Sequence, residues 1–450
     1  MVDLEGLAET TVRYVMKLGA SACDVLAADS KFTSAEIEKG SMKQSSQIRD
    51  PGVGIRAFKN GCSGFSFCTG HDRRLIHKIA ELAVSQARAG TPDPDFKGLP
   101  EKMKPAKVAG LFERSIPELE ADDVVEMAIS LSDYAGDDKR ITSVNAGVTI
   151  GEGTFALANS NGFASSQRMT SFELSAEAVA REGSEMFSGV DAGASRKLST
   201  EMIERAGTNA RDHALMGLKG TKLETGDYPV VMDPLAVGFV FGMAIGGGVN
   251  AESVQRKRSY LTGQLGKKIG SEKLTVYDDP TIDWATGSYS FDGEGVPAYK
   301  KTIIGRGKLE TYLYDSLAAG KDARPSTGNA SRGGSIWSFR RIPSISPSNL
   351  VVRRGDSSMD EMISETRNGV YLRLTYDYPN LATGEFSGLM MESFKIERGE
   401  LGPSVRQATM GVHLVDMFSR VDMIGKKVRD VFGVRTPALR ISKARIGGSS

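Results

Sequence analysis

The segment from Asp233 to Ser259 constrains the fold of this chain more than any other. It opens on an Asp-Pro pair that suits a helix start, because Asp233 can cap the first turn and Pro234 lacks an N–H that would have no partner there. The run that follows is apolar on nearly every side and ends on three consecutive glycines, 246–248. Because a helix that is apolar all round is buried, the sequence predicts a central core helix over residues 233–248.

Residues 1–220 have the pattern of an αβ domain. Apolar residues at helical spacing predict four helices: 4–18, 72–88, 118–135 and about 200–216. Strands are expected between them, among them 53–59, 62–67, 141–150 and 154–159. Asn60-Gly61 is a strong hairpin signal, since both central residues of a type I′ turn need positive φ. The order of helix, strands and helix suggests two similar halves, 1–90 and 118–220, although no residue-level repeat supports them.

Residues 221–450 are expected to form a larger, mostly antiparallel, β-rich domain around the helix 233–248. Two segments, Ile304–Leu309 and Ile396–Leu401, each have the pattern of strand, glycine turn and strand, so each predicts a hairpin. Two further helices are expected here: 359–366 and 410–424. The predicted fold class is therefore α+β, with an αβ N-terminal region and a β-rich C-terminal region.

Charge and composition exclude several function classes. The chain has 450 residues, with 57 Lys and Arg against 56 Asp and Glu, so no strong field for nucleic acid or for an acidic membrane surface is expected. No apolar run reaches the length of a membrane span, and the N-terminus lacks the basic start and apolar core of a secretory signal. Three cysteines are too few for a disulfide framework, which favours a reducing cytoplasm.

A family resemblance rests on four short segments in one order and spacing: Leu274–Pro280, Phe291–Pro297, Ser326–Ala330 and Thr383–Gly388. Together with the central helix they are similar to the TldD/PmbA family. Active members of that family bind zinc through a His-Glu-x-x-x-His helix. Laid on that pattern, the first His falls on Gly242, the Glu on Met243 and the second His on Gly247. The frame of the motif is present and its ligands are absent.

The resemblance is to the PmbA/TldE branch, the paralogue that pairs with the zinc-bearing TldD. It implies a non-catalytic, zinc-free subunit of a metallopeptidase complex, with a cleft that holds unfolded or short peptides. A TldD-like partner would supply the zinc, the general base and the chemistry, and this chain would have no catalytic residue, metal or cofactor of its own. The alternative is a homodimeric peptide-binding or regulatory protein without peptidase activity. A third hypothesis is an independent enzyme with an unrecognised site. The balanced charge gives no reason to add DNA binding, despite the family's older label as a gyrase modulator.

Histidines and cysteines offer one other metal hypothesis. The chain has four histidines, none of them at the i, i+4 spacing of a zinc-binding helix, and no cysteine after Cys68. Cys62, Cys68, His71 and His77 lie within sixteen residues of one another. Structural zinc sites usually place two cysteines two to four residues apart, whereas Cys62 and Cys68 are six apart. We therefore expect half-buried thiols and surface histidines here.

Four charged residues are candidates for contacting a peptide: Asp279, Asp292, Glu294 and Arg256. The carboxylates lie near glycine turns and could meet a peptide's amino terminus, and Arg256 follows the central helix and could clamp a carboxylate. Acids beside Gly or Pro are also turn formers, and a basic run after a helix is commonly a solvated face. The residue types alone favour the structural reading for all four.

Overall fold

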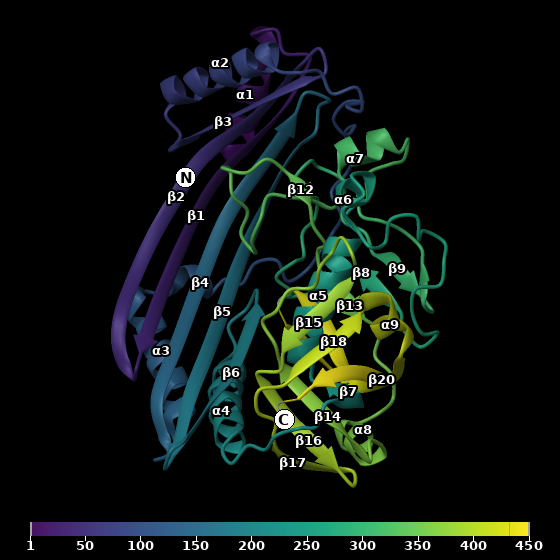
Figure 1. Cartoon of the computed structure of the whole chain (residues 1–450). Coiled ribbons are helices and arrows are strands. Elements are labelled where there is room, and N and C mark those ends of the chain that lie inside the picture. Colours follow the sequence, from purple (N-terminus) through teal and green to yellow (C-terminus); the bar gives the residue numbers. More distant parts are fainter. Residues whose placement is uncertain (1, 432, 449–450) are drawn as a thin grey trace.

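A computed structural model describes residues 2–431 and 433–448, which form two large sheets side by side (Figure 1). The first sheet is antiparallel throughout, in the order β3-β2-β1-β4-β5-β6. Its strands are β1 Ala22–Glu38, β2 Ser41–Lys59, β3 Cys62–Thr69, β4 Ile141–Asn159, β5 Ala164–Glu182 and β6 Glu185–Ser195.

Four helices cover one face of this sheet: α1 Leu4–Lys17, α2 Arg73–Ala89, α3 Ala121–Gly136 and α4 Thr200–Met216. The odd-numbered side chains of β1 and the even-numbered ones of β4 pack under these helices, as the period of two in a strand requires. The order helix, three strands, helix occurs twice along the chain, and β1 and β4 meet in the middle of the sheet. The domain boundaries expected near residues 90, 118 and 220 stay predictions.

The hairpins expected from local turn chemistry are confirmed. Asn60 and Gly61 have φ values of 53° and 79° between β2 and β3, where Lys59 pairs with Cys62. The two later hairpins use an Arg-Gly pair in the same way, with positive φ at both residues of Arg306-Gly307 and of Arg398-Gly399. These are the left-handed conformations that a two-residue type I′ turn demands.

Strand β4 of the first sheet is longer than the sequence predicted. The two strands expected over 141–150 and 154–159 are one strand, β4, which continues through Gly151 and Gly153. A side chain at Gly153 would meet Phe155 and Ile336, so this glycine permits close packing at the place where the two predicted strands were separated. Glycine in these strands therefore marks the place where the C-terminal region lies against the sheet.

The second sheet, built from the C-terminal region, has the central order β10-β9-β8-β13-β20-β7-β14-β16-β17, with β15, β18 and β19 attached to it. Most of its pairs are antiparallel, and β13–β20 and β14–β7 are parallel, so the predicted α+β class is confirmed. Its strands are β7 Gly226–Met232, β8 Val276–Asp278, β9 Lys301–Gly305, β10 Lys308–Leu309, β13 Leu350–Val352, β14 Asn368–Leu374, β15 Glu385–Leu389, β16 Glu392–Glu397, β17 Glu400–Ser404, β18 Thr409–His413, β19 Val421–Val431 and β20 Val434–Gly447. A small separate sheet pairs β11 Ala330–Ser331 with β12 Ser344–Ile345.

The predicted core helix is confirmed as α5, Pro234–Gly248, which packs on β7, β14, β19 and β20. The side chain of Asp233 caps it, accepting a hydrogen bond from the N–H of Leu235 (2.8 Å). The remaining helical segments are short: η1 Ile116–Glu118, α6 Ala251–Gln255, α7 Ser316–Lys321, α8 Met359–Glu365 and α9 Leu414–Ser419. In the described part of the chain no helix is both long and apolar enough to cross a membrane.

The helix expected over 410–424 is wrong in extent. Residues 409–413 form β18, which pairs with both β15 and β20, and only 414–419 are helical. Sheet pairing on both sides of Met410 and Gly411 satisfies the backbone better than a lone helix could, so tertiary contacts override the helical spacing there.

Candidate functional site

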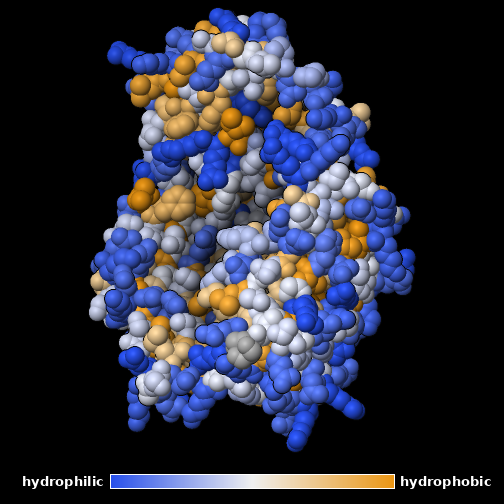
Figure 2. Space-filling view, viewed as in Figure 1, coloured by the Kyte–Doolittle hydropathy of each residue, from blue (hydrophilic) through white to orange (hydrophobic). Residues whose placement is uncertain are grey.

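A long cleft lies between the helix-free face of the first sheet and the C-terminal region, and Figure 2 shows the hollow at the centre of the molecule. It consists of two volumes, about 590 Å³ and about 870 Å³. Both volumes are lined by Glu36, Gly147 and Ser175, so they form one continuous trough. Each is within the size range of small-molecule sites in proteins.

The floor of the cleft consists of residues that lie directly opposite one another on neighbouring strands of the first sheet. Glu36 lies opposite Gly147, which lies opposite Ser175, which lies opposite Ala192. The neighbouring rows place Glu173 and Glu177 on the same face as Ser175, because alternate residues of β5 point the same way. Most other floor residues are Gly, Ala, Ser or Thr, so the backbone of a bound chain can approach closely between the carboxylates.

The charged groups of the cleft are mainly acidic. Five carboxylates line the two volumes: Glu36, Glu38, Glu173, Glu177 and Glu392. Only two cationic side chains line them, Lys43 and Arg196. Lys43 lies at the edge, 3.1 Å from Glu38 and 3.8 Å from Glu36. Glu177 accepts a hydrogen bond from Asn145 Nδ2 (3.1 Å), and among the described residues it has no ion-pair partner.

Arg196 is buried, and backbone carbonyls occupy its whole guanidinium group. Its five N–H bonds go to the carbonyl oxygens of Thr170, Ala285, Thr286, Ser288 and Ser335, at 2.6 to 3.2 Å. Burial lowers the pKa of Arg196 to about 9, and the charge of Glu173 opposes that shift. The side chain therefore ties the end of β6 to the C-terminal loops and has no N–H left for a ligand.

One end of the cleft is apolar. Four side chains with large exposed apolar surface line the larger volume there: Met186, Tyr376, Leu389 and Met391. Phe239 on α5 packs edge-on against Tyr376, with ring centroids 5.9 Å apart, and Tyr378 lies beside the same ring. Single exposed apolar residues are common on proteins, whereas a group of them around one hollow indicates a binding surface.

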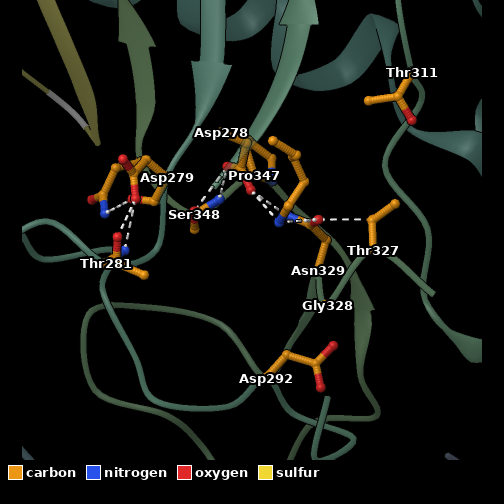
Figure 3. Close-up of polar contacts among 12 residues, drawn as sticks. Asp278, Asp279, Thr281, Asp292, Thr311, Thr327, Gly328, Asn329, Pro347 and Ser348 are labelled. Atoms are coloured by element: carbon orange, nitrogen blue, oxygen red, sulfur yellow. Dashed lines mark hydrogen bonds and ion pairs between the residues drawn. The ribbon is translucent and has the colours of Figure 1, made fainter. Parts of the chain in front are cut away.

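A buried polar network stiffens the opposite wall of the cleft (Figure 3). The carboxylate of Asp278 accepts hydrogen bonds from the N–H and hydroxyl of Ser348, which lines the cleft, and from Asn329 Nδ2. Lys301 Nζ completes it, 3.0 Å from Asp278 and 3.1 Å from the side-chain oxygen of Asn329. Each buried polar group has a partner, so this wall has one defined arrangement.

Two buried charge networks hold the C-terminal region against the first sheet. In the first, Asp24 lies between Arg56 (2.6 Å) and Arg332 (2.5 Å), and Arg56 also reaches Glu294 (2.8 Å). All four side chains are buried. Two acids and two bases from both parts of the chain thus neutralise one another at the interface.

The second network fixes the edge strand β6. Arg373 Nη1 donates to the carbonyl of Val190 (2.6 Å) and pairs with Glu392, whose other oxygen accepts from the N–H of Val190 (2.7 Å). Burial raises the pKa of Glu392 to about 7, with Arg373 opposing the shift. Both backbone groups of Val190 are therefore satisfied by side chains of the C-terminal region, which join β6 to β14 and β16 beside the cleft.

The three positions where the resemblance places the metal motif lie on one part of α5. Gly242 and Gly247 offer no ligand, and the side chain of Met243 is 40% exposed. A β-carbon at Gly242 would lie 2.7 Å from Val434, and one at Gly247 would overlap Leu381. Within residues 2–431 and 433–448 no three His, Cys, Asp or Glu side chains are placed to hold a metal ion together. The residues present do not fit a zinc ion at this helix.

The second metal hypothesis also finds no shared site. Cys62 Sγ faces the carbonyl of Gly90 at 3.3 Å, and Cys68 lies at the far end of β3. His71 bonds the carbonyl of Ala28, and the ring of His77 stacks on Tyr14 with centroids 3.9 Å apart. Each of these side chains thus has its own local environment.

The four peptide-contact candidates lie outside the two cleft volumes. Asp279 accepts hydrogen bonds from the N–H and hydroxyl of Thr281, and Arg256 pairs with Glu252 one turn earlier at 2.7 Å. Asp292 accepts from three backbone N–H groups, and Glu294 belongs to the first charge network. Their role in peptide binding stays a prediction.

The sequence reasoning did not single out the acids of the cleft floor. Glu173 and Glu177 alternate with Leu174 and Ala176, a pattern that marks a strand with one buried face. That alternation shows that the glutamates share the open face, but only the tertiary structure shows that this face is the floor of a cleft.

The two-part α+β fold encloses a cleft between its parts, and comparison with known families identifies the class of protein to which this scaffold belongs. The family models that match are the PmbA/TldA metallopeptidase domain 1 over residues 23–87, central domain over 114–218 and C-terminal domain over 225–448. The chain belongs to the PmbA/TldD metallopeptidase family.

Individual relatives agree over nearly the full length. A metalloprotease of Methanothermobacter thermautotrophicus is 28% identical over 450 aligned residues that cover 95% of each chain. The metalloprotease PmbA of Escherichia coli O157:H7 is 27% identical, over 89% of this chain and 86% of that one. The crystal structure of TldE from Thermococcus kodakarensis covers 98% of this chain and 99% of its own, with a TM-score of 0.90 and 21% identity, and so shows the same fold.

Proposed function

We propose that this chain is the non-catalytic, zinc-free, PmbA/TldE-like subunit of a TldD/TldE-type metallopeptidase that acts on unfolded or short peptides. A TldD-like subunit would carry the zinc, the general base and the bond-breaking step. This chain would complete the enclosure around the substrate and admit only chains that fit its cleft. Its three cysteines are free, which suits a complex working in the cytoplasm.

The observation that carries the proposal is that α5 has no zinc-binding side chain at the three positions of the family's motif. A catalytic zinc needs about three protein ligands and an open position, yet Gly242, Met243 and Gly247 provide none. The glycines are also closely packed, so the helix serves as a wall element. Side chains of this chain therefore have three tasks in the proposal: to bind the peptide, to orient it and to limit access.

Metal content tests this proposal directly. Mass spectrometry on the purified chain should find no stoichiometric zinc, and about one zinc per pair after co-expression with a TldD-like partner. Peptide hydrolysis should appear only in the pair. Stoichiometric zinc and peptidase activity in the lone chain, persisting after metal stripping and reloading, would contradict it.

The homodimeric alternative has its own outcome in the same experiment. A chain that purifies as a stable dimer of itself, and that fails to form a stoichiometric complex with a TldD-like subunit, would be a peptide-binding or regulatory protein. The cleft would then be its working site without any partner chemistry.

A further inference from the structure

We propose that the cleft selects extended peptides that carry basic side chains next to large apolar ones. The carboxylates of the floor would receive the basic groups, and the apolar end around Tyr376, Leu389 and Met391 would receive the apolar ones. This inference rests on the proposed function for its source of peptides, but binding itself requires no partner and no metal.

The floor fits an extended chain in spacing. Glu173 and Glu177 lie four residues apart on β5, about 13 Å along the strand, which is close to the repeat of every fourth residue in a bound strand. Ser175 lies between them, opposite Gly147, and because both residues are small they leave room for a peptide backbone. A peptide running along the trough can therefore place two side chains that are four residues apart over the two carboxylates.

Charge complementarity specifies the ligand further. The whole chain is nearly neutral, with a net charge of +1, so the excess of carboxylates in the cleft is local. Of the two cations, Arg196 is saturated by carbonyls and Lys43 lies at the edge beside Glu38. A phosphate or an acidic peptide would meet repulsion on this floor, whereas lysine or arginine would meet carboxylates in a partly desolvated trough.

The apolar end distinguishes a peptide from a simple polyamine. Leu389 and Met391 expose apolar surface into the same hollow that Glu177 lines. Burial raises the pKa of Tyr376 there, and the charges of Glu392 and Glu177 raise it further. A polyamine would pair with the carboxylates but would leave this apolar surface exposed to water. A peptide with leucine or phenylalanine beside its lysines would cover it, and burial of that surface supplies affinity.

The test is a binding titration on the purified full-length chain by fluorescence anisotropy. The probes are labelled, end-capped octapeptides with two lysines followed by a leucine and a phenylalanine, and a second set has the reversed sequence. Two comparison peptides replace the lysines by glutamates or the apolar residues by serines. We expect the basic-apolar peptide to bind at least tenfold more tightly than either comparison peptide, and to weaken as salt is raised.

Variants locate the binding. Glu173→Gln with Glu177→Gln keeps both acceptors for Ser335 and Asn145 while removing two charges, and should weaken binding about tenfold. Glu126→Gln, on the exposed face of α3, removes a carboxylate outside the cleft as the charge control and should change nothing. Leu389→Ser should weaken binding of the basic-apolar peptide several-fold, and Leu75→Ser, equally exposed but on α2, is its control.

Clear outcomes would overturn the inference. One is equal binding of the acidic peptide, and another is displacement of the probe by spermidine at the same concentration as by peptide. The inference would also fail if no saturable binding appeared up to about 1 mM, or if the cleft variants bound peptide as their controls do. Selective binding in a chain that forms no stoichiometric complex with a TldD-like subunit would support the inference and refute the proposed function. The two can therefore fail separately.

Discussion

Arg332→Met should destabilise the protein far more than an exposed arginine substitution, because Arg332 lies at the centre of the first charge network. Its guanidinium donates to Asp24 Oδ1 (2.5 Å), the carbonyl of Gly293 (2.9 Å) and the carbonyl of Arg341 (3.3 Å). The side chain is fully buried. Methionine fills much of the same volume but supplies no donor, so Asp24 keeps only Arg56.

The expected magnitude follows from what the substitution leaves behind. Breaking a buried ion pair from one side typically costs about 3–5 kcal/mol, because an uncompensated charge stays in a poorly solvated place. Arg56 still faces Asp24 and Glu294, so the network would hold one excess negative charge between the two parts of the chain. Exposed pairs contribute below about 1 kcal/mol.

Urea unfolding followed by circular dichroism measures the difference, with Arg49→Met as the matched control. Arg49 makes a bidentate pair with Asp29, but its side chain is 71% exposed. The double variant Asp24→Asn with Arg332→Met removes both charges and should be less destabilised than the sum of the two single variants. If Arg332→Met and Arg49→Met lowered the free energy of unfolding equally, the interface would not depend on this network, and the reasoning would be refuted.

Two further predictions concern pH and packing. Burial, together with the charge of Glu294, raises the pKa of Asp292 to about 7 from an ordinary value of 3.8. The folded state therefore holds a proton that the unfolded state releases, so the free energy of unfolding should fall as the pH rises from about 4 to 7. Asp292→Asn should flatten that slope in urea titrations at several pH values, and an unchanged slope would refute the shift. Gly54→Ala should lower the free energy of unfolding by about 1–3 kcal/mol, and with it the melting temperature, because the added methyl group would overlap the carbonyl oxygen of Phe339. Gly136→Ala, whose methyl would meet only ordinary contact in a helix, should be neutral or stabilising by about 0.5 kcal/mol; equal effects in calorimetry would contradict the packing argument.

Local chemistry explains which parts of the fold the sequence could predict. Asp233 and Pro234 define the start of α5, and Asn60-Gly61 defines a hairpin, because each depends on residues adjacent in the chain. The length of β4 was missed because glycine at 151 and 153 usually marks a turn. Here distant residues pack onto that strand, which no local pattern reveals.

The site was harder to predict for the same reason. Asp24 and Arg332 are 308 residues apart and still share a buried hydrogen bond. Glu173 and Glu177 have an unremarkable alternating pattern on a strand, and they line the cleft only because the C-terminal region folds back over that face. The resemblance directed attention to α5, whereas the acidic floor lies on the other side of the cleft.

The packing of α5 bears on how a family scaffold can be present without the motif. Gly242 lies against Val434, Gly246 lies against Pro347, and Leu381 occupies the space beside Gly247. Histidine at 242 or 247 would have to displace these neighbours, so the absent ligands and the close packing belong to one arrangement of side chains. Pro347 also lines the cleft, and through it the glycine face of the helix supports the wall opposite the acidic floor. Under the proposed function, a helix that would otherwise present ligands has become a support for the substrate channel, and the chemistry is left to the partner.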